Sequence, residues 1–212
     1  MNVQHDIIIC TTAVDRPELH KNTFTKYLEF LDGCNFHWMI HLNNVWSNYV
    51  HSMNMIRDLL QDKSYEIIFS SDGGKNIDFF NAGKKLIETC TNHESKYGVL
   101  WLEDDWEYIG NDKLIDILGD YDYLQLVERN KEMSFNPGVF SWDVVKNIMQ
   151  PNMKRTGYKK YNDNPERTAL FKDNEDVSFS VENHVVKPNF RDIGREWMAR
   201  EHNGKRVFNI NV

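Results

Sequence analysis

The sequence predicts an α/β protein with a mostly parallel central sheet flanked by helices. In the first half, short apolar runs of strand length alternate with longer segments whose apolar residues recur at helical spacing. A strand that is followed by a helix and then by another strand gives parallel pairing through a right-handed crossover. No linker rich in proline or glycine divides the 212 residues, so we expect a single domain.

The first half of the chain is expected to form four strands and three helices. Asp15 with Glu18 three residues later is a capping-box pattern, Pro17 suits a first helical turn, and Gly33 can end that helix. The strands are expected over 6–10, 36–42, 66–69 and 98–102, and the other two helices over 50–60 and 77–89.

The second half is less regular. We expect short helices over 112–118 and 143–149, and strands over 123–127 and 138–140. The polar stretch 151–173 is typical of a long loop that can act as a flap over a site. Apolar residues over 177–185 fit strand and helix periods equally well, so their conformation stays open.

Composition and charge exclude several classes of protein. Lys and Arg number 25 against 32 Asp and Glu, and a net charge of −7 disfavours nucleic acid and anionic membrane as partners. No apolar run approaches the roughly 20 residues of a membrane span. The three cysteines are few and far apart, which favours a reducing, cytoplasmic location without a structural disulfide.

Three consecutive carboxylates, Glu103, Asp104 and Asp105, follow the apolar run 99–102 directly. Ligands of a parallel sheet bind beyond the carboxyl ends of its strands. Adjacent carboxylates repel each other unless a cation lies among them, and hard oxygen ligands favour Mg²⁺ or Mn²⁺. Alternation along a strand end predicts that Glu103 and Asp105 share one ion. The alternative is a solvated acidic turn.

Two further segments are candidates for binding an anionic ligand. Thr11, Thr12 and Arg16 follow the first predicted strand, where hydroxyl groups and a guanidinium can hold a base, ribose or phosphate. Helix-start chemistry explains part of that segment equally well. Lys75 follows two glycines after the third strand and can meet a phosphate, although a plain turn is the alternative.

The last candidates come from the second half. Glu175 and Asp176 follow the long polar stretch, and a carboxylate there can act as a general base, or else cap a helix. His202 lies in a charged terminal segment, where it is either a late metal ligand or a surface histidine.

Taken in order, these segments resemble the GT-A glycosyltransferases. The resemblance covers roughly residues 6–185, and its individual motifs are short. Residues 11–17 resemble the family's nucleotide-binding loop, 74–83 its donor-side glycine segment, and 102–105 its cation-binding DxD motif. Residues 135–140 are similar to its acceptor-side segment, and Glu175-Asp176 to the pair that supplies the base in inverting members.

The resemblance implies a GT-A, Rossmann-like fold with a nucleotide-sugar-binding half over 1–106 and an acceptor-side half over 107–212. It also implies transfer of a sugar from a nucleoside diphosphate sugar, with UDP-sugar as first choice, to a glycan hydroxyl with Mn²⁺ or Mg²⁺. Two departures are Glu103 at the first DxD position and Asn43-Asn44 where many relatives place an aspartate against the base.

The sequence is also similar to glycosyltransferase domains of large chlorella-virus proteins, which implies further domains in a longer polypeptide. Two other functions remain open from the residues alone. One is a metal-dependent phosphohydrolase or nuclease that uses the same acidic turn, and the other is a carbohydrate-binding module built on the six Trp and nine Tyr.

Overall fold

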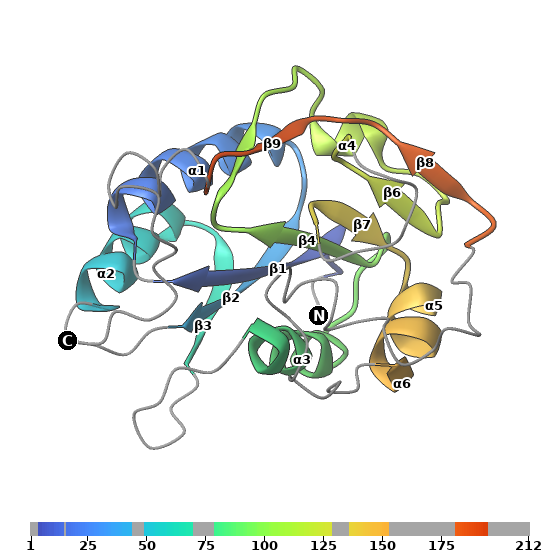
Figure 1. Cartoon of the computed structure of the whole chain (residues 1–212), viewed down its shortest axis with the longest axis horizontal. Helices are drawn as coiled ribbons and strands as arrows, with labels where there is room; N and C mark the ends of the chain where they lie inside the picture. The colour runs from blue at the N-terminus through green and yellow to red at the C-terminus, as the bar shows by residue number, and fades with distance from the viewer. Residues whose placement is uncertain are drawn as a thin grey trace, which may run out of the picture.

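A seven-stranded sheet forms the centre of the molecule, and a two-stranded sheet lies beside it (Figure 1). The computed structural model describes residues 4–14, 16–43, 49–69, 79–128, 136–152 and 181–194. The strands are β1 Ile7–Val14, β2 Phe36–Asn43, β3 Ser64–Phe69, β4 Val99–Glu103, β5 Trp106–Tyr108, β6 Tyr123–Gln125, β7 Gly138–Phe140, β8 His184–Val186 and β9 Phe190–Asp192.

Three long helices and three short ones pack around these strands (Figure 1). One π-helical turn, Val145–Met149, joins the last two short helices into a continuous segment. The helices are α1 Pro17–Phe30, α2 Tyr49–Leu60, α3 Phe79–Cys90, α4 Leu114–Ile117, α5 Trp142–Val144 and α6 Gln150–Asn152.

The order of the large sheet is β3-β2-β1-β4-β7-β6-β8. β3, β2, β1 and β4 run parallel to one another, whereas β7 is antiparallel to β4 and to β6. β8 is parallel to β6, and β5 pairs with β9 in the small sheet. The prediction of an α/β fold with a mostly parallel sheet flanked by helices is confirmed.

Side-chain alternation along the strands divides the core into two layers. Ile7, Ile9 and Ala13 of β1 pack with α1 and α2 on one face, and Ile8 and Cys10 pack with α3 on the other. Both faces of the parallel strands are therefore covered by helices, which explains why the strands are continuous apolar runs.

Two element boundaries differ from the prediction in ways that affect the site. β1 continues to Val14, so Thr11 and Thr12 belong to a strand and not to a loop, because β2 and β4 pair with β1 on its two sides. α1 begins at Pro17 as expected, but Arg16 occupies the N-cap position and its side chain makes no capping hydrogen bond. Asp15 itself lies outside the described residues.

Three short strands, β5, β8 and β9, are present in addition to those predicted. Each has three residues, too few to show a hydrophobic period. Most of the predicted loop over 151–173 lies outside the described residues, as do residues 177–180 of the open segment 177–185. The end of that segment forms the start of β8. Within the described part of the chain, no helix is both long enough and apolar enough to cross a membrane.

Candidate functional site

The carboxyl ends of the parallel strands bring several predicted site residues to one edge of the sheet. Thr12 of β1 is in register with Glu103 at the end of β4, and Val14 is in register with Asn43 at the end of β2. The acidic turn therefore follows β4 at the edge where ligands of parallel sheets bind. The side chain of Asn43 lies outside what the structure describes.

Asp104 is buried at the centre of this edge and is bound from several sides. Its carboxylate accepts hydrogen bonds from the Val14 backbone N–H at 3.0 Å and from Arg16 Nε at 3.3 Å and Nη2 at 2.5 Å. His20 Nε2 of α1 lies 2.8 Å from Asp104 Oδ2. Asp104 thus joins the end of β1, the start of α1 and the acidic turn.

The opposite charges of Arg16 and Asp104 stabilise each other. Burial raises the pKa of the Asp104 carboxyl, but the Arg16 charge and the His20 hydrogen bond outweigh it, and the net pKa is lowered. Burial likewise lowers the pKa of Arg16, and the charges of Asp104 and Asp105 raise it further than burial lowers it. Both groups are charged at neutral pH, as a buried ion pair requires.

Glu103 is turned toward the protein interior. Its side chain is buried, and its Oε2 accepts a hydrogen bond from Trp106 Nε1 at 2.8 Å. The hydroxyl of Tyr27 lies 2.5 Å from the backbone oxygens of both Glu103 and Trp106. These contacts hold the two ends of the acidic turn against α1.

Asp105 is the most accessible carboxylate of the turn, with 28% of its side chain exposed. Its Oδ2 lies 3.9 Å from Arg16 Nη1. Gly194, after β9, packs closely against it: a Cβ there would lie 2.3 Å from Asp105 Oδ2, so the carboxylate can occupy this position because residue 194 has no side chain. The expected alternation of Glu103 and Asp105 does not apply, because β4 ends at Glu103 and the next two residues form a turn.

The threonines expected in a binding loop lie in the sheet instead. Thr11 is fully buried, and its hydroxyl accepts a hydrogen bond from Trp38 Nε1 at 2.9 Å. Thr12 is nearly buried, and its backbone oxygen accepts from the Asp104 N–H at 3.3 Å. Arg16 lies at the acidic turn, where its guanidinium pairs with Asp104.

Four predicted site residues lie outside the described residues: Lys75, Glu175, Asp176 and His202. Asn44 also lies outside them, and of Asn43 the backbone is described but not the side chain. Arg191 of β9 pairs with Glu107 of β5, with Nη2 2.6 Å from Oε2.

Sequence reasoning missed three contributors to the site: His20, Tyr27 and Gly194. Arg16, His20 and Tyr27 are spaced by four and seven residues, so they lie on one face of α1. A histidine within an otherwise apolar helical face was the available signal for His20. Nothing in the sequence pointed to Gly194, because its role depends on a contact with Asp105 across 89 positions of the chain.

Comparison with known proteins bears on the fold. A scan against models of protein families finds no match, and a search of curated proteins finds no significant match. Among solved structures, a mannosyltransferase from Pyrobaculum calidifontis, in complex with GDP-Man and Mn²⁺, is similar with a TM-score of 0.50 and 10% identity. The chain shares its fold with this mannosyltransferase. The match covers 68% of this chain and 46% of the mannosyltransferase, so it spans less than half of that protein.

Proposed function

We propose that this chain is a divalent-cation-dependent glycosyltransferase that moves a sugar from a nucleoside diphosphate sugar to a hydroxyl group of a glycan. The observation that carries the proposal is the accessible carboxylate of Asp105 on a turn fastened at the carboxyl edge of the parallel sheet. The shared fold with a mannosyltransferase supports it. The aromatic residues argue against a stacking surface, since Trp38, Trp101 and Tyr123 are fully buried.

The surroundings of Asp105 fit Mn²⁺ or Mg²⁺. Its carboxylate supplies a hard oxygen ligand, and 28% of its side chain is exposed to solvent. In this proposal Asp105 is the main ligand, Glu103 supports the turn through Trp106, and His202 is a further ligand from the C-terminal segment. A cation bound there would neutralise charge that develops on a departing diphosphate.

The protein's own residues hold and orient the site. Arg16 and His20 bind Asp104 and so keep the next residue, Asp105, at the sheet edge. In the proposal Asp104 is therefore a positioning residue and not a cofactor ligand. Arg16 also places positive charge 3.9 Å from Asp105, which opposes the repulsion among the three carboxylates.

The donor and the base are proposed from the predicted residues. A UDP-sugar is the first candidate donor, and a GDP-sugar is the second, because the similar mannosyltransferase was solved with GDP-Man. In the proposal, Asn43, the last residue of β2, and Lys75, which follows β3 in the sequence, contact the nucleotide. Asp176, with Glu175 beside it, would accept the proton of the acceptor hydroxyl if the reaction inverts configuration.

A thermal-shift experiment tests the proposal. We expect UDP or GDP to raise the unfolding temperature only when Mn²⁺ or Mg²⁺ is present, because a ligand at about 100 times its Kd stabilises the native state by about 2.7 kcal/mol. The variant Asp105→Asn should lose this shift. Asp120→Asn, which removes the same charge from an exposed position, should keep it. A wild-type protein that binds neither nucleotide with metal, or an Asp105→Asn variant that binds normally, would contradict the proposal.

A further inference from the structure

A second group of metal-binding side chains lies away from the acidic turn. His37 is the second residue of β2, Glu66 lies in the first half of β3, and His93 lies in the turn that follows α3. β2 and β3 are parallel and reach the candidate active site with their carboxyl ends. The group formed by His37, Glu66 and His93 therefore occupies the amino-terminal part of these strands, on a different region of the sheet.

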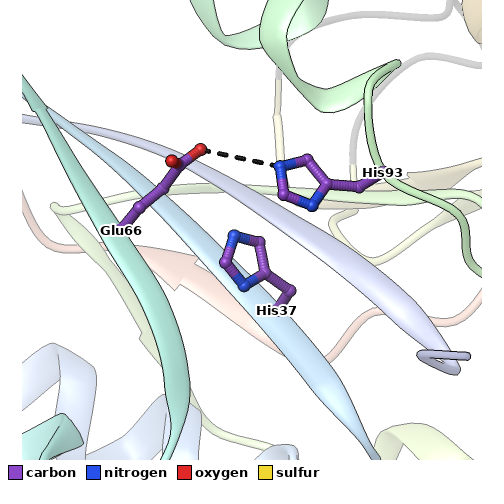
Figure 2. A group of neighbouring side chains, drawn as sticks. All are labelled: His37, Glu66 and His93. Carbon is purple, nitrogen blue, oxygen red and sulfur yellow. Dashed lines mark ion pairs between the residues drawn. The ribbon is translucent and has the colours of Figure 1, made fainter. Parts of the chain in front are cut away.

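The three side chains converge in space (Figure 2). Each offers one ligand atom, and these atoms all lie within 4.8 Å of one another. Glu66 Oε1 lies 3.8 Å from His93 Nε2, and Figure 2 shows the carboxylate pointing toward the His93 ring. The rings of His37 and His93 are stacked, with centroids 4.4 Å apart and planes inclined by 22°.

The orientation of His37 is fixed by a neighbouring hydroxyl. Its Nδ1 lies 2.7 Å from Ser64 Oγ at the start of β3. When Nδ1 donates its proton to Ser64, the Nε2 atom carries the free lone pair. A histidine metal ligand commonly makes such a hydrogen bond with its other ring nitrogen, which sets both the tautomer and the ring orientation.

Two atoms of the group are buried without a hydrogen-bond partner among the described residues. They are His37 Nε2 and Glu66 Oε1, which has only the longer ion pair to His93. A buried polar atom without a partner destabilises the native state, and an ion is one of the few groups that can satisfy a lone pair on each. The arrangement thus combines available lone pairs, mutual proximity and a fixed ring.

We propose that His37 Nε2, Glu66 Oε1 and His93 Nε2 form a binding site for a transition metal ion of the Zn²⁺ class, with water completing the coordination. Two imidazoles and one carboxylate suit Zn²⁺, whereas Mg²⁺ and Ca²⁺ prefer oxygen ligands alone. The site therefore differs in chemistry as well as in place from the cation site proposed at Asp105.

The side chains have the freedom to close around an ion. Tetrahedral ligands with bonds of about 2.0 Å lie about 3.3 Å apart, somewhat closer than the 4.8 Å limit of this group. His93 and Glu66 have 29% and 39% of their side chains exposed, so both can move inward and an ion can enter.

A bound ion would connect three separate parts of the chain. It would join β2 and β3 to the turn between α3 and β4, close to His5, whose ring centroid lies 5.7 Å from that of His37. Binding to the native state alone raises stability in proportion to the logarithm of ligand concentration. The inferred role is thus to fasten the amino-terminal part of the sheet.

The test is a Zn²⁺ titration of the full chain without an affinity tag, after removal of metal with a chelator. Competition with a chromophoric chelator should give one site in the wild type. The variant His93→Gln should bind at least about tenfold more weakly, since even the loss of a residue that only orients a ligand costs that much. His51→Gln, which removes an exposed histidine of α2, is the matched control and should bind as the wild type does.

Two further variants make the outcome decisive. Glu66→Gln removes the carboxylate and should also weaken Zn²⁺ binding. It therefore tests the site even if His93→Gln folds poorly. Asp105→Asn should leave Zn²⁺ affinity unchanged, so failure of the proposed transferase function does not affect this result. The inference is overturned if the wild type binds no Zn²⁺, if both cluster variants bind it as tightly as the wild type, or if Asp105→Asn abolishes binding.

Discussion

Asp104 holds the acidic turn in place through a buried ion pair. Replacing it with alanine leaves the nearly buried Arg16 guanidinium and the fully buried His20 without this carboxylate. Removing one partner of a buried pair typically costs about 3–5 kcal/mol. We expect Asp104→Ala to lower the free energy of unfolding by that amount, measured by urea denaturation monitored by circular dichroism.

Asp32 provides the comparison for this variant. It pairs with Lys113 on the surface, where both side chains are more than half exposed. Because solvent screens exposed pairs, Asp32→Ala should change stability little. Equal losses for Asp104→Ala and Asp32→Ala would show that the Arg16–Asp104 pair does not support the fold.

His41 makes stability depend on pH. This residue of β2 is buried, and burial lowers its pKa to about 4 from an ordinary value of 6.5. Between about pH 6.5 and pH 4, His41 is protonated in the unfolded chain but not in the folded chain. The free energy of unfolding therefore falls as pH decreases through this range. From about pH 7 to about pH 5, we expect this residue to cost about 2 kcal/mol.

The measurement is the free energy of unfolding at both pH values for two variants. His41→Gln cannot titrate, so it should lose about 2 kcal/mol less than the wild type between them. His51→Gln, at an exposed position of α2, should keep the wild-type pH dependence. An unchanged pH dependence in His41→Gln would rule out this source.

At the scale of elements, α1 supports the acidic turn along one of its faces. Tyr27 contributes to this support, because its hydroxyl lies 2.5 Å from the backbone oxygens of Glu103 and Trp106. Burial, and then the charges of Asp105, Asp104 and Glu103, raise the pKa of Tyr27 well above its usual range, so its hydroxyl keeps its proton as a donor.

Removing this hydroxyl should loosen the turn. We expect Tyr27→Phe to lower the free energy of unfolding by about 1–3 kcal/mol, the cost of leaving a buried acceptor unsatisfied. It should also weaken Mn²⁺-dependent nucleotide binding, because Asp105 belongs to the same turn. Calorimetric titration with nucleotide and Mn²⁺, alongside urea denaturation, measures both effects.

A second tyrosine separates the local effect from the general one. Tyr108 donates its hydroxyl proton to the Asp112 backbone oxygen at an exposed site. Tyr108→Phe deletes the same chemical group away from the turn and should leave nucleotide binding as in the wild type. If both variants bind nucleotide normally, α1 does not govern the conformation of the acidic turn.

The elements also show where sequence reasoning succeeds. The first seven elements were predictable because short apolar runs of strand length alternate with longer segments whose apolar residues recur at helical spacing. The strands of the small sheet were not, because β5 and β9 are defined by pairing with each other across the chain. The extension of β1 through Thr11 and Thr12 likewise depends on pairing with β2 and β4.

In the candidate site, too, local sequence predicted some features, whereas others depend on contacts between distant segments. The position of Glu103, Asp104 and Asp105 at the sheet edge followed from their place after a buried strand. Their separate environments did not, because Asp104 is buried by Arg16 and His20 from α1, while Asp105 is left accessible beside Gly194. Only contacts between distant segments decide which of three adjacent carboxylates can meet a ligand.

At the scale of the whole molecule, the cysteines report on the integrity of the core. Cys10, Cys34 and Cys90 are all free in the structure. The separation of the cysteines along the sequence does not keep them apart in space, because Cys10 of β1 and Cys90 of α3 belong to the same buried cluster. The two thiols are neighbours that remain reduced.

This placement predicts how the thiols react. Burial, and then a hydrogen bond with Cys90, raises the pKa of Cys10 well above its usual range. Burial, and then the charge of Asp6, raises the pKa of Cys34 to about 12. Since the thiolate is the reactive form, we expect Cys10 and Cys34 to react slowly with a disulfide reagent in the native protein near neutral pH. Cys90 is buried, so we expect the reagent to reach it slowly as well.

In denaturant without reductant, the same reagent should titrate three thiols at once. In the native protein, Cys10 of β1 and Cys90 at the end of α3 are buried where α3 packs on the sheet, so their labelling requires opening of the core and should proceed together. Labelling followed by mass spectrometry at increasing urea concentration checks this, with Cys34 as the internal comparison, because it is only partly buried. Rapid native labelling of Cys10, or fewer than three thiols in the denatured chain, would contradict the packing of α3 against β1.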